Sequence, residues 1–154
     1  MVAVKIPARD IIVQVKDPAQ SNTWVQLNQL TSANLNKGEN EEVAETTTFD
    51  SGGEYEEVIM QRGGTLELEG FLRKDLTTGD RDAGQKLVDA WADTKGISSV
   101  GQVRYRHPMD PKWTEWDATC RGGEEGGETN DMTSWEASFT RCGPKRLTNV
   151  VVTP

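Results

Sequence analysis

Apolar and polar residues alternate along several short stretches of the chain, which is the pattern of strands with one face buried. Residues 65–73 are the clearest case, because Leu66, Leu68, Gly70 and Leu72 alternate with longer or charged side chains. Turn residues such as Asp17-Pro18 separate such stretches. The pattern predicts strands over residues 11–15, 24–30, 65–73, 100–107, 114–121, 133–141 and 150–152.

One stretch has the spacing of a helix instead. Ala83, Leu87, Ala90 and Trp91 recur at helical intervals, and Val88 widens that apolar stripe. The preceding Asp82 is a good N-cap with Gln85 as its capping-box partner, and Gly96 is a suitable stop. Together these elements predict a mostly-β fold: a β-sandwich or small barrel of about seven strands with one flanking α-helix over about residues 82–95.

The segment of residues 38–63 departs from this pattern. It opens at a Lys37-Gly38 turn, contains a β-prone run over residues 43–49, turns again at residues 51–53 and returns through Gly63-Gly64. Structureless connections of this length are uncommon in compact domains, and the run Thr46-Thr47-Thr48-Phe49 favours strand over disorder. We expect a long acidic loop or hairpin arm here, a solvated acidic loop without a partner being the alternative.

The net charge of −8 resides in that segment. The chain has 25 acidic and 17 basic residues, and eight of the acidic ones lie between Glu39 and Glu57, where there is no Lys or Arg. The remainder of the chain is therefore neutral. Direct nucleic-acid binding is disfavoured, because Lys145 and Arg146 form only a small basic spot.

The length of 154 residues predicts one domain over residues 1–154, with an N-terminal arm 1–10 and a C-terminal tail 144–154. No apolar run is long enough for a membrane span or a signal peptide, so we expect synthesis in a cytoplasm. A reducing compartment favours free thiols at Cys120 and Cys142 over a disulfide.

Candidate chemistry is sparse. The single histidine, His107, precedes Pro108 at a strand end and lies in no nucleophile motif. Residues 75–82 are rich in aspartate but lack the ligand spacing of a calcium loop. The acidic pairs occupy exposed loops, which cannot raise a carboxyl pKa as a glycosidase requires. We therefore expect no enzyme, no cofactor and no structural metal.

Several segments resemble the major tail tube proteins of long-tailed, non-contractile bacteriophages. They are Glu41-Glu42-Val43 through Gly52-Gly53, Leu66 to Leu72, Thr78 to Gln85, Trp113 to Thr119, Asn130-Asp131 and Thr133 to Arg141. The resemblance covers roughly residues 10 to 143.

The resemblance implies a structural virion subunit that forms hexameric rings, which stack into a hollow conduit for genome delivery. Its partners would be copies of itself and the tape-measure, tail-terminator and distal-tail proteins, while phage DNA passes without specific binding; no membrane is involved. The protein would reside in the virion, and in the host cytoplasm during assembly. The segment 38–63 matches the family's inter-ring loop, which makes its residues contact candidates: Glu39, Glu41, Glu42, Val43, Glu45, Thr47, Phe49, Asp50, Glu54, Tyr55, Glu57 and Arg62.

Four alternatives stay open. One is a tail-completion or terminator protein that forms a single ring, and another is the tube protein of a related injection or secretion system. A carboxylate hydrolase would need a pocket around paired acids. A carbohydrate-binding sandwich would need exposed Trp113 and Trp116, whereas alternation places Trp116 on the apolar face.

Overall fold

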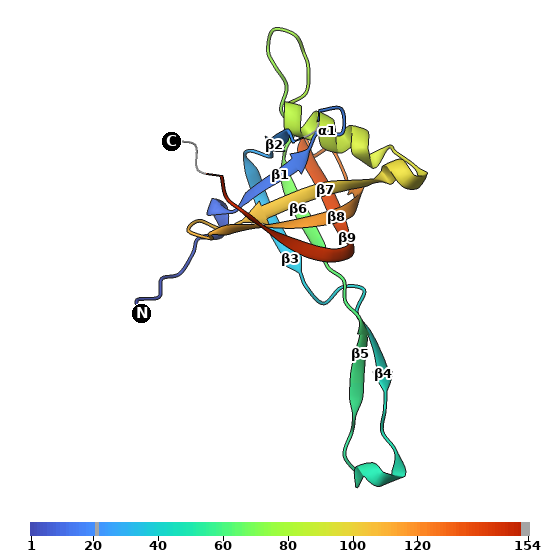
Figure 1. The fold of residues 1–154 in the computed structure, drawn as a ribbon. Coiled ribbons are helices and arrows are strands. Elements are labelled where there is room, and N and C mark those ends of the chain that lie inside the picture. The colour runs from blue at the N-terminus through green and yellow to red at the C-terminus, as the bar shows by residue number, and fades with distance from the viewer. Residues whose placement is uncertain (21, 152–154) are drawn as a thin grey trace.

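A computed structural model describes residues 1–20 and 22–151. Its body is a seven-stranded antiparallel sheet in the order β2-β1-β7-β8-β9-β6-β3, and β4 and β5 form a separate two-stranded sheet (Figure 1). This confirms a mostly-β fold with one flanking α-helix. The strands are β1 (Ile12–Lys16), β2 (Trp24–Gln26), β3 (Leu30–Asn36), β4 (Glu42–Glu45), β5 (Glu57–Gln61), β6 (Thr65–Phe71), β7 (Val100–Arg106), β8 (Lys112–Gly122) and β9 (Ser134–Asn149).

The sheet curls until its two edges approach each other. β2 and β3 are the two edge strands, yet only residues 27–29 connect them along the chain. The four Cα–Cα steps from Gln26 to Leu30 span about 14 Å at most, so the edges cannot lie far apart where the two strands join. No pairing joins β2 to β3 within the part of the chain that is described, so the sheet does not close into a barrel.

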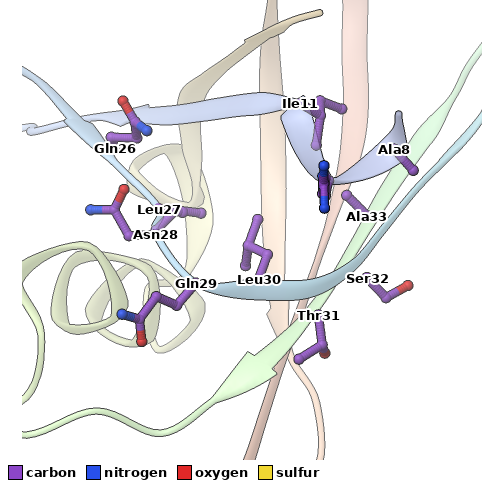
Figure 2. A pocket seen from close by; sticks show the side chains of 11 residues that line it. Ala8, Ile11, Gln26, Leu27, Asn28, Gln29, Leu30, Thr31, Ser32 and Ala33 are labelled. Atoms are coloured by element: carbon purple, nitrogen blue, oxygen red, sulfur yellow. The ribbon is translucent and has the colours of Figure 1, made fainter. Parts of the chain in front are cut away.

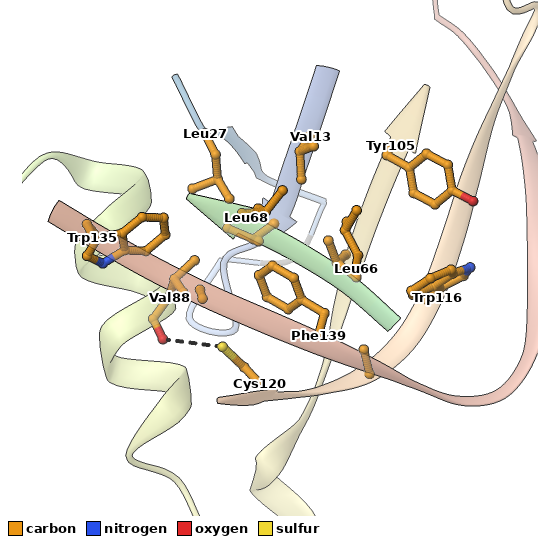
Figure 3. Packing of buried hydrophobic residues seen from close by; sticks show 14 residues of the cluster. Val13, Leu27, Leu66, Leu68, Val88, Tyr105, Trp116, Cys120, Trp135 and Phe139 are labelled. Atoms are coloured by element: carbon orange, nitrogen blue, oxygen red, sulfur yellow. Dashed lines mark hydrogen bonds between the residues drawn. The ribbon is translucent and has the colours of Figure 1, made fainter. Parts of the chain in front are cut away.

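The core lies inside this curl. Alternate residues of each strand are buried there, as Leu66 and Leu68 of β6 and Trp135 and Phe139 of β9 illustrate (Figure 3). Trp116 belongs to this cluster, which confirms the side assigned to it by alternation. The large aromatic side chains make the interior possible in a chain that is only 34% hydrophobic.

The helix α1 (Ala83–Ala92) packs against β8, β1 and β2 at one end of the curl (Figure 1). Gly84 lets it approach closely, because an added Cβ would lie 2.7 Å from the Leu27 side chain. Two details of the predicted helix are wrong. The buried face contains Gly84, Gln85 and Val88, whereas Ala83 and Ala90 are exposed.

The predicted capping box is also absent. Asp82 occupies the N-cap but its carboxylate accepts from Arg73 Nη1 at 3.1 Å. The Gln85 side chain instead accepts from the Arg73 N–H and donates to the Phe71 carbonyl, so it fastens the helix to the end of β6.

Three strand predictions need correction. The single strand expected over residues 24–30 is two strands, broken where Gln29 has a φ of 56°. The expected tail from residue 144 continues as part of β9 to Asn149, which pairs with Lys112. Val150 and Val151 lie outside any strand, and Val152 of that predicted strand lies outside the described residues.

Short 3₁₀ turns complete the fold: η1 (Ala8–Asp10), η2 (Phe49–Ser51) and η3 (Gly96–Ser99). η1 lies within the predicted N-terminal arm and packs against the edge strand β3.

Candidate assembly interface

Residues 38–63 form a hairpin that projects away from the body, and we call this segment the arm (Figure 1). β4 and β5 pair antiparallel with Val43 opposite Ile59 and Glu45 opposite Glu57. Two carboxylates directly opposite each other are unfavourable, and an isolated two-stranded hairpin is marginally stable in water. The arm therefore gains little stability from its own contacts.

The tip of the arm is nevertheless held by several side-chain hydrogen bonds. Thr48 caps η2 by accepting from the Asp50 N–H, and the Ser51 hydroxyl accepts from the Thr48 N–H at 3.0 Å. The Ser51 hydroxyl also donates to Glu56 at 2.9 Å, and the Thr47 hydroxyl accepts from the Glu56 N–H. This network fixes the turn while its first residue points outward.

That outward residue is Phe49, whose side chain is fully exposed. A phenyl ring held in solvent at the end of a fixed turn is costly unless another surface covers it. Further exposed apolar side chains extend along the hairpin on both of its faces: Val43, Tyr55, Val58, Ile59 and Met60. The arm is thus a long, mostly acidic surface with apolar anchors that the described residues leave uncovered.

The twelve contact candidates all lie in the arm, and all are exposed except Glu41, which is partly buried. Glu41 lies 3.9 Å from Arg62 at the root of the arm. The Tyr55 hydroxyl donates to Glu57, and this hydrogen bond raises the tyrosine pKa. The role of the twelve candidates in contacts between copies stays a prediction. Val58, Ile59 and Met60 were not among the candidates, although three consecutive apolar residues beside an acidic run are a usable signal.

The body offers little that resembles an active site. A cavity of about 320 Å³ lies between η1 and β3. In Figure 2 the apolar Ile11, Leu30 and Ala33 face its interior, and among the residues lining it Arg9 alone is charged. No group of metal-ligating side chains occurs within the described residues. No helix in that part of the chain is long and apolar enough to cross a membrane.

Charged groups of the body are used to hold it together. Arg104 lies between the rings of Trp24 and Trp113, 4.3 and 4.2 Å from their centroids, and burial lowers its pKa. Arg81 contacts Glu125 and Asp89 at 2.7 and 2.6 Å. Both arrangements tie separate segments together rather than forming a reactive site.

Neither Cys120 nor Cys142 forms a disulfide in the described part of the chain. Cys120 is buried and its thiol lies 3.8 Å from the Val88 carbonyl oxygen (Figure 3). Burial, together with the nearby Asp89 carboxylate, raises the thiol pKa to about 12. The thiol is therefore protonated at neutral pH and is a packing group rather than a nucleophile.

Comparison with solved structures finds chains of phage-like particles. No protein-family model matches this chain, and no curated protein sequence matches it. A chain from the tail of an empty gene transfer agent particle, refined helically with C6 symmetry, superposes with a TM-score of 0.71 at 16% identity, covering 92% of this chain and 98% of that one. A chain from the virion of the native gene transfer agent particle gives 0.64 at 17% identity, with the same coverage. The protein therefore has the fold of chains found in the tail and virion of gene transfer agent particles.

Proposed function

We infer that this chain is the structural subunit of a phage-type tail tube, in which six copies form a ring and the rings stack into a hollow conduit for DNA. The observation that carries this inference is the likeness over nearly the whole chain to a protein of a tail assembly with C6 symmetry. Within the described residues no group of metal-ligating side chains occurs, which agrees with a structural role.

The arm supports stacking in particular. It carries exposed apolar anchors and eight acidic residues, all of them exposed except Glu41, and it projects in one direction only (Figure 1). A contact between this arm and a different surface on the next copy is head-to-tail, and head-to-tail contacts that do not close produce filaments. The exposed sheet edges would pair around the ring, which also protects them from uncontrolled pairing.

The outer face of β6 and β9 is suited to line the channel. Glu67, Glu69 and Glu136 share that face, and the register places Glu69 directly opposite Glu136. Adjacent like charges weaken a sheet, so their presence favours a use outside folding. A ring of carboxylates would repel phosphates and let DNA slide without sticking.

Negative-stain electron microscopy of the purified full chain, at low and high concentration, tests the proposal. We expect hollow tubes or stacked six-fold rings at high concentration. Single closed rings that never stack would instead identify a tail-completion protein. Recovery of the chain from particles that lack DNA and deliver proteins would identify a tube of an injection or secretion system.

A further inference from the structure

A basic cavity of about 220 Å³ lies at the root of the arm, on the body. Four cationic side chains line it, together with Tyr105 and Trp116; the four are Lys37, Arg62, Arg141 and Lys145. No acidic side chain contributes to its lining. The Glu41 carboxylate, which is not part of the lining, lies 3.9 Å from the Arg62 guanidinium.

Two buried donors in this lining lack an acceptor. Trp116 is only 3% exposed, and neither its indole Nε1–H nor the Nε–H of Arg141 has a hydrogen-bond partner among the described residues. Figure 3 shows the Trp116 nitrogen and the Tyr105 hydroxyl at the same end of the core. A buried donor left without an acceptor costs free energy, and most native structures avoid that cost. A cavity that combines cations with unpaired donors is complementary to an anionic acceptor.

The tip of the arm supplies acceptors of this kind. The tip of the arm carries Asp50 and Glu54 beside the exposed Phe49, and neither carboxylate forms an ion pair or hydrogen bond among the described residues. Outside the arm the acidic and basic residues nearly balance, at 17 and 16, so charge complementarity matches the arm of one copy to the cavity of another. Carboxylates accept well from both indole and guanidinium donors.

The dimensions of the fold agree with this match. From Asn40 to Asp50 the extended hairpin spans about 30 Å at roughly 3.4 Å per residue, and in Figure 1 it projects away from the body. A head-to-tail stack can therefore bring the tip of one arm to the root of the next copy's arm. The cavity lies at that root, because Lys37 and Arg62 flank the arm.

We propose that the cavity lined by Lys37, Arg141, Lys145 and Trp116 is the receptor for the arm tip of a second copy, and that Asp50 or Glu54 is the carboxylate it binds. This inference rests on the proposed stacking of rings. To that proposal it adds the surface on the neighbouring copy that the tip of each arm contacts.

A zero-length carbodiimide crosslink tests the contact in assembled tubes, because it joins a carboxylate to a lysine amine only when the two touch. Tubes are assembled from a mixture of unlabelled and nitrogen-15-labelled full-length chain, and crosslinked peptides are identified by mass spectrometry. We expect mixed-isotope crosslinks from Asp50 or Glu54 to Lys37 or Lys145. Crosslinks from the tip to Lys74, Lys86 or Lys95 instead would overturn the receptor assignment and leave the tube intact.

Neutral variants provide a second measurement. Asp50→Asn with Glu54→Gln should raise the lowest concentration that yields tubes about tenfold or more, as expected for the loss of a charge-assisted hydrogen bond. The control Glu124→Gln with Glu128→Gln removes the same charge from a glycine-rich loop and should change nothing. If both pairs of substitutions raised the assembly concentration equally, the loss of net charge alone would explain the effect. The proposed contact would then be rejected.

Two further outcomes separate the competing explanations. If inorganic phosphate shifts the tryptophan fluorescence of the monomer and the tubes give no tip-to-cavity crosslink, the cavity is a site for a small anion and the inference fails. If the chain forms no stacked rings at all, the proposed function fails, and this inference fails with it.

Discussion

Single residues stabilise this body where segments distant in sequence meet. Arg81 is the clearest example, since its guanidinium contacts Asp89 in α1 and Glu125 in the loop before β9. The hydrogen bond from Arg81 lowers the pKa of Glu125, while Glu125 and Asp89 raise that of Arg81. All three side chains are about one-third exposed, so solvent screening keeps the stabilisation modest.

The substitution Glu125→Gln should therefore lower the free energy of unfolding by about 0.5–1 kcal/mol at pH 7. Because the folded-state pKa of Glu125 is depressed, its contribution is fully present above the unfolded-state value of about 4.3. The contribution is lost as the pH falls through the folded-state value. Urea unfolding should thus show the variant and the parent converging in acid, with Glu124→Gln unchanged throughout. A difference that persists in acid would mean that the glutamine disturbs packing.

At the scale of elements, the sequence pattern predicted those strands and the helix whose residues are buried at regular intervals. Strict alternation in β6 and the spacing of α1 were sufficient, because one face of each meets the core. β3 was missed because residues 31–36 are mostly polar, and this edge strand buries no residue fully. Its separation from β2 depends on a left-handed Gln29, a conformation that glutamine seldom signals.

The continuation of β9 past Pro144 illustrates the same limit. Gly143-Pro144 has the composition of a stop, but the strand bulges there: Cys142 pairs with Asp117 and Arg146 pairs with Glu115. Gly143 adopts a φ of 74°, which allows the bulge. Long-range pairing with β8, which no local pattern encodes, extends the strand past Pro144.

The contact candidates in the arm were predicted from its charge. The cavity at the root of the arm could not be predicted in this way, because it depends on which side chains the fold brings together.

The arm is the element whose removal should separate folding from assembly. Phe49→Ser should leave the free energy of unfolding within about 0.5 kcal/mol of the parent, as for other exposed positions. The substitution should also prevent the stacking of subunit rings, because the phenyl group of Phe49 is the largest apolar group at the tip. Thermal unfolding and electron microscopy measure the two effects, with Ile97→Ser in η3 as a control of similar exposure. Tubes of normal length in Phe49→Ser would show that the tip anchors nothing.

At the scale of the whole molecule, charge is divided between two surfaces with different proposed uses. The acidic arm faces outward from the fold, and Glu67, Glu69 and Glu136 form a smaller acidic group on the outer face of β6 and β9. In a stacked tube, only a surface that repeats around the channel can act on DNA along its whole path. This predicts separate consequences when each surface is neutralised.

Glu67→Gln with Glu69→Gln should leave tube assembly intact and slow DNA release several-fold, because phosphates would then meet a wall without repulsive charge. The effect should be largest at low ionic strength, where screening is weakest. The matched control is Glu124→Gln with Glu128→Gln, which removes the same charge from a loop. Particles carrying either pair are compared by the rate at which DNA becomes accessible to nuclease after triggering. Equal rates would place the channel lining on another face of the sheet, whereas shortened tubes would assign these carboxylates to ring contacts.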